Sequence, residues 1–343
     1  MSAAQPLDVL IVSLGSTAGL RSADEELAAS LRRAGASVAI AAADRPRPMR
    51  TLALTDLGWA LAARAAAKRA LAAGQPGAVL YSTTTAALLW PAPGAIRFDA
   101  PAAGNRPGRH GFWQRPLERR RLLSAPLLLP LSEGGLREAR ASLERRAIVL
   151  PLAVEPSGPP GAERDIAAVT YAGNPVKKGL ARVLAAWRTA RATAGDGAEL
   201  VVAGAAPDEL CAAGIDLGAE PGVRDAGRLS QADYRALLRR ARVFVTAPRR
   251  EDYGQAQLEA LADGCLLATT PAPGPYAALP LARRLDASLV DDDLGGALAR
   301  AFSHRDPEGY AARALRELAP LRAAAIDARV ASELLPRLLS GRD

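Results

Sequence analysis

Residues 243–264 read VFVTAPRREDYGQAQLEALADG, and this stretch decides the fold. Its first five residues are apolar, as in a buried strand, and residues 256–262 continue a helix that Gly264 can end. Between the two elements, Gly254 allows the backbone to approach a ligand closely. A strand, a loop and a helix in this order predict a ligand site at the carboxyl edge of a parallel sheet.

The predicted loop and helix also indicate which ligand the edge would bind. The first backbone N–H groups of a helix are unpaired and lie at the positive end of its dipole, so they favour a phosphate or a diphosphate. Glu251 lies in the loop and Glu259 lies eight positions later, on the helix. We therefore expect the two carboxylates to flank a bound anion.

This pattern resembles the donor-site signature of retaining glycosyltransferases of family 4. The resemblance is carried by Glu-x7-Glu, by Gly254 three positions after the first Glu, and by Glu-Ala-x-Ala-x-Gly at the end. It extends upstream through DAGRLSQADY (residues 225–234). Further back, YAGNPVKKG (residues 171–179) resembles the strand, glycine turn and Lys-Gly that open the nucleotide-sugar domain of that family. The N-terminal half is similar only in layout.

The resemblance implies an α/β protein of the GT-B fold, with two Rossmann-like α/β/α domains facing a cleft. It implies transfer of a sugar from a nucleotide diphosphate sugar to an acceptor, with retention at the anomeric carbon and with no metal or other cofactor. Glu259 would bind the ribose hydroxyls, and Glu251 would bind hydroxyls of the donor sugar. Lys178 and the N–H groups near Tyr253 and Gln255 would stabilise charge on the departing diphosphate.

Other residues are assigned to the site by the same resemblance. Gly173, Asn174 and Arg228 are expected at the donor, although the family usually has an Arg where Asn174 stands. Gly15 lies in a loop that could touch acceptor or phosphate, and this loop lacks the Gly-x-Gly-x-x-Gly spacing of an NAD site. His110 stands where the family often places a histidine in the cleft, and an ordinary surface loop is the alternative.

Lysine is rare in this chain, which makes one pair of lysines informative. Three of the 44 basic residues are lysines, and two of them are Lys177 and Lys178. A lysine is a compact point charge suited to phosphates. Lys178 precedes Gly179 as in the family motif, so we expect it to face the diphosphate; a solvated first turn is the alternative.

The predicted elements alternate between strand and helix, which indicates parallel sheets. The predicted domains are residues 1–155 on the acceptor side, 161–305 for the nucleotide sugar, and 306–343, whose helices would pack back on the first domain. The proline-rich residues 151–160 are predicted as the linker. Strands are expected at 8–13, 37–41, 78–81, 95–99, 127–131, 148–150, 168–172, 199–203, 243–247 and 266–269.

Two helix starts are predicted from capping residues. Residues 22–25 (SADE) form a predicted capping box, which would open a helix that Gly35 ends. The acidic run at residues 291–293 is predicted to cap a helix beginning at Leu294 and not to bind a metal. The two histidines, His110 and His304, are far apart in sequence, so zinc or Ser-His-Asp chemistry is not expected.

Length and composition fit a two-domain enzyme. The 343 residues are too many for one core, and 49% hydrophobic with 23% charged residues is a globular composition. No apolar run has the length of a membrane span, and no stretch has the pattern of a signal peptide, so a cytoplasmic protein is expected.

The net charge of +8 is concentrated in the first half. Residues 1–160 hold 20 basic and 12 acidic side chains, and residues 161–343 hold 24 of each. Between Arg97 and Arg146 there are 11 arginines and five acids, together with Phe112 and Trp113. Such a patch could meet an anionic membrane surface, which would make the protein peripheral to the inner membrane, or a phosphorylated acceptor. The alternative is a solvated arginine-rich helix.

Two other functions remain open at the level of sequence. One is a GT-B enzyme of another reaction type, such as a nucleotide-sugar epimerase. The other is a non-catalytic binding protein whose basic half binds a partner such as nucleic acid, which the donor-site resemblance does not lead us to expect. The sugar, the base of the nucleotide and the acceptor are not specified by the motifs.

Overall fold

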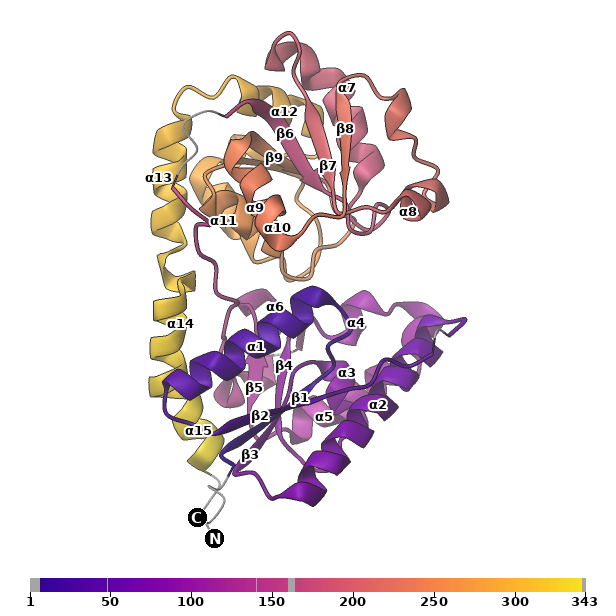
Figure 1. The fold of residues 1–343 in the computed structure, drawn as a ribbon, viewed down its shortest axis with the longest axis vertical. Coiled ribbons are helices and arrows are strands. Elements are labelled where there is room, and N and C mark those ends of the chain that lie inside the picture. The colour runs from indigo at the N-terminus through magenta and orange to yellow at the C-terminus, as the bar shows by residue number, and fades with distance from the viewer. Residues whose placement is uncertain (1–6, 48, 140, 160–163, 341–343) are drawn as a thin grey trace. The chain divides into compact units, whose positions relative to one another are not determined.

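The structure is a computed structural model that describes residues 7–47, 49–139, 141–159 and 164–340 (Figure 1). The chain forms two compact units. The first consists of Met1–Ala153 and Ala323–Asp343, and the second of Val154–Arg322. The predicted boundary at residue 306 therefore shifts, because helix α13 (Pro307–Glu317) belongs to the second unit and only the segment from Ala323 onward joins the first.

The first unit has a parallel sheet of five strands in the order β2-β1-β3-β4-β5. Its strands are β1 (Val9–Ser13), β2 (Val38–Ala42), β3 (Ala78–Tyr81), β4 (Ala95–Phe98) and β5 (Leu128–Pro130). The chain leaves β1 for β2 on one side and then returns to β3 on the other. Strands β1 and β3 thus form the topological switch point, where ligands of open α/β sheets bind.

Helices cover both faces of this sheet. They are α1 (Ala18–Arg33), α2 (Leu52–Ala73), α3 (Thr84–Ala87), α4 (Ala102–Asn105), α5 (Gln114–Ser124), α6 (Glu133–Ala139), α14 (Ala323–Arg329) and α15 (Leu335–Leu339). Successive residues of β1 point to opposite faces. Val9 and Ile11 pack in one core cluster with residues of α1 and α14, and Leu10 and Val12 pack in another with residues of α2 and α5.

The second unit repeats this design with the strand order β10-β9-β6-β7-β8. Its strands are β6 (Ile166–Tyr171), β7 (Leu200–Ala203), β8 (Val223–Gly227), β9 (Ala241–Thr246) and β10 (Leu266–Thr269). All neighbouring strands are parallel. The chain runs from β6 to β7 and β8, and then crosses to β9 on the other side of β6. The switch point is therefore between β6 and β9.

The helices of the second unit include the two that follow the predicted motifs. They are α7 (Leu180–Ala194), α8 (Pro207–Ala212), α9 (Gln231–Arg240), α10 (Gln255–Ala262), α11 (Ala278–Asp286), α12 (Leu294–Phe302) and α13. Helices α7 and α12 pack together through Trp187, which is fully buried and meets the Phe302 ring edge-on at 6.2 Å. Helix α12 begins at Leu294 with Asp293 as its cap, as predicted.

Two local predictions are wrong. Residues 148–150 are not a strand. Ile148 N–H donates to Leu128 O and Leu150 N–H donates to Pro130 O, each at 2.9 Å. The segment therefore runs beside β5 but does not form the regular hydrogen bonds of a strand. Helix α1 does not begin at the SADE box, because Thr17 caps it by accepting from Leu20 N–H at 3.2 Å. An earlier cap therefore places Ser22 inside the helix.

Candidate active site

The loops that follow β6 and β9 lie next to each other at the switch point of the second sheet. Strands β6 and β9 pair directly, with Ala168 opposite Val243. Beyond the strands, Arg249 N–H donates to Lys177 O at 3.0 Å and so ties the second loop to the first. Two motifs that are far apart in the sequence therefore meet at one edge, as the carboxyl ends of adjacent parallel strands require.

Both helices that leave these loops begin at a glycine. Gly179 precedes α7 with φ of 67°, and Gly254 precedes α10 with φ of 94°. These left-handed conformations favour glycine, and neither helix has a side-chain cap, whereas Ser230 caps α9 and Asp293 caps α12. The first intrahelical bond of α10 is that of Leu258 N–H to Gly254 O, at 3.1 Å. The preceding N–H groups are therefore available to an anion.

The two predicted catalytic residues of this edge are in direct contact. Lys178 Nζ lies 2.6 Å from Glu251 Oε2, and Gln257 Nε2 donates to the same oxygen at 3.2 Å. Glu251 is buried and the Lys178 side chain is 19% exposed, so this is a largely desolvated ion pair. A ligand that binds to Lys178 or to Glu251 must therefore break this ion pair.

Lys177 has a different environment from its neighbour. Its side chain is 47% exposed, and its Nζ lies 2.8 Å from Asp252 Oδ2. Arg250 Nε donates to the other oxygen of Asp252 at 3.0 Å. Burial of Asp252 opposes its ionisation, but the two cations outweigh burial and hold its pKa below the usual range. Lys177 therefore belongs to a permanent ion network, while Lys178 faces the buried interior of the site.

Glu259 lies on α10, buried under two amide donors. Gln231 Nε2 donates to its Oε1 at 3.1 Å, and Gln255 Nε2 donates to the same atom at 3.2 Å. Burial raises the pKa of Glu259, and these hydrogen bonds oppose the shift. The predicted Glu-x7-Glu pair therefore consists of one carboxylate that holds a cation and one that accepts hydrogen bonds from neutral groups.

Three other predicted residues shape the backbone of this edge. A Cβ at Gly173 would come within 2.7 Å of the Tyr171 hydroxyl, so a larger residue there would require the Tyr171 ring to shift. Asn174 Oδ1 accepts from Lys177 N–H at 2.9 Å and closes the turn that leads to Gly179. Tyr253 is buried, and its carbonyl accepts from Ala277 N–H at 2.8 Å.

The remaining predicted residues are outside this cluster. Arg228 is exposed and paired with Glu209 at 2.8 Å. Gly15 belongs to the first unit and has φ of 55°, and its carbonyl accepts from Arg21 at 2.7 Å. His110 is exposed on a 3-10 turn, Gly108–Gly111, and it does not line either pocket described below.

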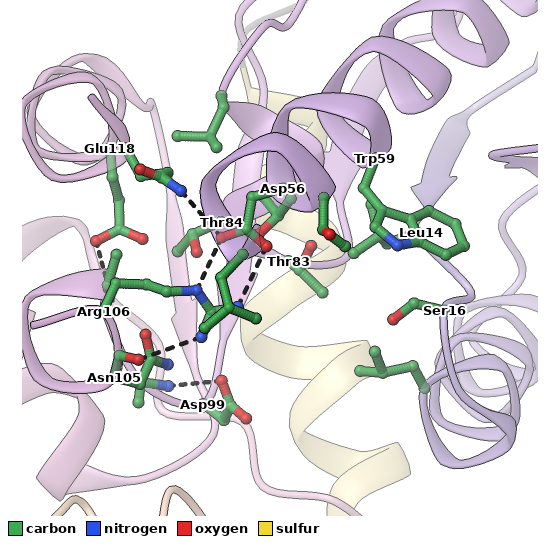
Figure 2. A pocket seen from close by; sticks show the side chains of 18 residues that line it. Leu14, Ser16, Asp56, Trp59, Thr83, Thr84, Asp99, Asn105, Arg106 and Glu118 are labelled. Atoms are coloured by element: carbon green, nitrogen blue, oxygen red, sulfur yellow. Dashed lines mark hydrogen bonds and ion pairs between the residues drawn. The ribbon is translucent and has the colours of Figure 1, made fainter. Parts of the chain in front are cut away.

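The first unit has a pocket of its own at the switch point between β1 and β3. The cavity has a volume of about 310 Å³. It is lined by Leu14 and Ser16 after β1, by residues 83–85 after β3, and by Asp99 after β4. Figure 2 shows Asp99, Arg106 and Glu118 on one side of the cavity and Trp59 on the other.

Helices α2 and α5 supply the buried polar groups of this pocket. Arg106 donates to Asp56 Oδ2 at 2.8 Å and to Oδ1 at 3.2 Å, and Gln114 Nε2 donates to Oδ2 at 3.1 Å. Glu118 Oε1 accepts from Ala102 N–H at 2.7 Å, and burial raises the pKa of Glu118 to about 7. The motif analysis did not identify these residues. One signal was present, because Asp56 is the single acid in the alanine-rich sequence of α2.

Within the described ranges, no group of three or more His, Cys, Asp or Glu side chains is arranged to hold a metal ion. Over the same ranges, no helix combines the length and hydropathy that a membrane span needs.

Comparison with known proteins finds a family match for part of the second unit and solved structures with the same fold. Residues 165–312 match the family model of the group 1 glycosyl transferases. No curated protein sequence matches the chain significantly. The match covers the loops after β6 and β9 with their helices, so the resemblance based on the motifs is confirmed for this segment.

Solved structures of glycosyltransferases share the fold over nearly the whole chain. WaaG, a glycosyltransferase involved in lipopolysaccharide biosynthesis, is 15% identical, with a TM-score of 0.70 over 94% of this chain and 99% of that one. Sucrose-phosphate synthase from Thermosynechococcus elongatus is 14% identical (TM-score 0.67; 99% and 100% covered). A trehalose 6-phosphate synthase from Burkholderia multivorans is 12% identical (TM-score 0.69; 98% and 100% covered). The predicted GT-B fold is confirmed.

Proposed function

We propose that this protein is a glycosyltransferase that moves a sugar from a nucleotide diphosphate sugar to an acceptor with retention of anomeric configuration. The observation that carries the proposal is the pair of glycine-started helices at the β6/β9 switch point, with Lys178 beside them. This edge offers N–H groups and a cation to a diphosphate. The group 1 glycosyl transferase match covers the same residues.

In the proposed reaction the donor diphosphate lies at the N-terminus of α10, beside Lys178; the first N–H of α7, that of Leu180, is already bonded to Pro175 O at 2.9 Å. As the bond between the anomeric carbon and the diphosphate oxygen breaks, the electron pair moves to that oxygen. Lys178 and the first N–H groups of α10 stabilise the new charge. Since these groups supply the positive charge, we propose that no metal is needed, and that EDTA leaves turnover unchanged.

The ion pair at the site gives Glu251 and Lys178 linked roles. When Lys178 turns to the diphosphate, Glu251 loses its cation and becomes free to accept hydrogen bonds from hydroxyls of the donor sugar. Glu259, deeper on α10, would accept from the ribose hydroxyls. The acceptor hydroxyl oxygen forms the new bond to the anomeric carbon on the face from which the diphosphate leaves, which gives retention, and its proton passes to the departing diphosphate oxygen.

The donor can be identified by thermal unfolding in the presence of UDP, GDP and ADP sugars. A ligand at 100 times its dissociation constant stabilises by about 2.7 kcal/mol. Glu259→Ala should lose most of the stabilisation, and Glu308→Ala, an exposed glutamate on α13, should keep it. Stabilisation by no nucleotide sugar would contradict the proposal. Conversion of the donor to an epimer without acceptor would identify an epimerase, and NMR of the product decides its anomeric configuration.

We also propose that helix α5 attaches the protein peripherally to an anionic lipid surface that carries the acceptor. Phe112 is 68% exposed, and with Leu123 it borders a hollow of about 450 Å³ that both apolar and charged side chains line. Arg109, Arg119 and Arg120 are exposed nearby, and none of the contacts described engages their side chains. Apolar side chains among free cations suit a surface of anionic headgroups.

Not every arginine of this helix is available to lipid. Arg121 donates to Leu88 O at 2.9 Å and its guanidinium lies 4.8 Å from the centre of the Trp90 ring, so it is part of the fold. The test is co-sedimentation with neutral and anionic vesicles at low salt. Changing Arg119 and Arg120 to Gln should release the protein from anionic vesicles. Changing Arg283 and Arg316, exposed arginines of the second unit, should not. If the two double variants weaken attachment equally, net charge and not helix α5 causes the attachment.

A further inference from the structure

The pocket of the first unit has more carboxylates than cations. Its described lining holds Asp56, Asp99 and Glu118, but a single guanidinium, that of Arg106. Arg106 is already engaged, since two of its nitrogens donate to the two oxygens of Asp56. A phosphate or carboxylate entering this cavity would meet the Asp99 carboxylate and a partly ionised Glu118, while the one cation of the described lining is already paired with Asp56.

The helix N-termini at this pocket are also occupied. Thr83 Oγ1 accepts from Ala86 N–H at 3.1 Å and caps α3. Glu118 Oε1 accepts from the first N–H of α4, that of Ala102. The protein's own oxygens therefore fill the positions that an anion would use at a helix N-terminus.

The buried amide of Gln114 has an unused acceptor. Gln114 is 2% exposed and lines the pocket. Its Nε2 donates to Asp56, but its Oε1 has no hydrogen-bond partner in the described part of the chain. A buried acceptor without a partner is costly. Because this oxygen has less than 1 Å² of accessible surface, a ligand hydroxyl reaches it only when the side chains that cover it shift. The pocket thus offers acceptors to a ligand that brings donors.

We propose that this pocket binds a neutral group that carries several hydroxyls. Resting on the proposed function, we assign that group as the acceptor sugar. Hydroxyls would donate to the carboxylates and to Gln114 Oε1, while Trp59 offers an apolar wall to a sugar ring. The volume of about 310 Å³ is at the small end of ligand pockets, which suits a small ring better than a lipid chain. The neutral acceptor group is then distinct from the anionic surface proposed to carry it.

The test is direct binding of paired probes to the full chain by calorimetry and saturation-transfer NMR. Each pair is a neutral sugar and its phosphate: glucose with glucose 6-phosphate, mannose with mannose 6-phosphate, and myo-inositol with its monophosphate. We expect at least one neutral member to bind, with its phosphate about tenfold weaker or more. Tighter binding of the phosphates, or binding of no member, would overturn the proposal.

Variants test whether the charge of the pocket determines its preference for a neutral sugar over the sugar phosphate. Asp56→Asn leaves Arg106 without its charged partner, so preference should move about tenfold toward the phosphate. Gln114→Met keeps the volume and removes the amide, so it should weaken the neutral sugar. Asp44→Asn is the control, because Asp44 also pairs with an arginine, Arg69 at 2.9 Å, on the exposed surface. An unchanged preference in a folded Asp56→Asn protein would refute the role of charge.

Failure here can be told apart from failure of the proposed function. Nucleotide-sugar stabilisation that Glu259→Ala abolishes reports on the second unit. If it persists while no neutral sugar binds, the donor site stands and the pocket assignment falls. If sugars bind while no nucleotide does, the pocket stands and the transferase proposal falls.

Discussion

The two units place a site at the same point of the same design, yet the helix N-termini at the two sites are capped differently. At the switch point of the second sheet, α7 and α10 begin at glycines without side-chain caps, and Lys178 stands beside them. At the switch point of the first sheet, Thr83 caps α3 and Glu118 accepts from the first N–H of α4. An open α/β sheet provides the location, and the caps decide whether an anion is accepted there.

This difference assigns complementary ligands to the two sites. A site with free N–H groups and a cation selects a diphosphate, while a site whose N-termini are occupied and whose carboxylates are in excess selects a neutral hydroxylated group. A transfer between a nucleotide sugar and a sugar hydroxyl needs one site of each kind. The two proposals together therefore account for the contrast.

The largest effect is expected where the contrast is strongest, at Lys178. Lys178→Ala should reduce donor turnover by about tenfold to hundredfold, because a hydrogen bond to a charged group is worth on the order of 1.5 to 3 kcal/mol. Lys177→Ala should cost only a few-fold, since Lys177 is half-exposed and bound to Asp252. Initial rates of donor consumption, with donor hydrolysis as the readout when no acceptor is added, measure both.

Glu251→Gln sharpens the same test. It keeps the shape of the side chain but weakens the hold on Lys178, so turnover should fall while nucleotide affinity holds or rises. Equal and small losses in Lys177→Ala and Lys178→Ala would instead make both lysines parts of a solvated turn.

An intermediate effect is expected from the pocket of the first unit. Burial raises the pKa of Glu118 to about 7, with Arg106 lowering it and Asp99 raising it further. Its folded pKa is above the unfolded value, so the stability it contributes is complete below about pH 4.5 and is lost as pH rises through about 7. Glu118→Gln should flatten the decline in unfolding free energy over this range, by on the order of 1 to 3 kcal/mol.

Denaturant unfolding between pH 4.5 and 8 measures this slope. Glu144→Gln, an exposed glutamate of the same unit, is the matched control and should leave the slope unchanged. Asp24 and Glu259 also have raised pKa values, so the wild type keeps a similar slope from other groups, and only the difference between variant and wild type tests Glu118. The same slope in Glu118→Gln as in the wild type would mean that this carboxyl ionises normally.

The sequence predicted the second site better than the first, for a physical reason. Glu251, Gly254 and Glu259 lie within one loop and helix, so local spacing determines how they are arranged. Asp56 and Gln114 are 58 positions apart and meet only because α2 and α5 pack on the same face of the sheet. The spacing of residues along the sequence does not reveal such a tertiary contact.

Local competition explains the remaining errors. The SADE box at residues 22–25 has the pattern of a helix start, but Thr17 begins α1 earlier. The separate roles predicted for Lys178 and Glu251 did not include their contact, because an ion pair between two loops depends on strand pairing. The strands were predicted most accurately, since apolar runs indicate nine of the ten described strands; β8 (Val223–Gly227), which has no buried residue, was not predicted.

The smallest effect is expected at Asn174, which closes a hydrogen-bonded turn next to the proposed diphosphate site. Asn174 Oδ1 holds the Lys177 N–H, and the residue is exposed. Asn174→Ala should lower stability by about 0.5 to 1 kcal/mol through loss of this turn, with donor affinity nearly unchanged.

Asn174→Asp keeps the acceptor and adds a negative charge, so stability should hold while donor affinity falls a few-fold, because an exposed charge contact is worth about 0.2 to 1 kcal/mol. Asn174→Arg should raise affinity by a similar factor, and both changes should fade as salt increases. Thermal unfolding measures the effect of the turn, and nucleotide titration at two salt concentrations measures the effect of the charge at position 174. If Asn174→Asp and Asn174→Arg bind the nucleotide equally well, position 174 does not face the diphosphate and belongs to the turn alone.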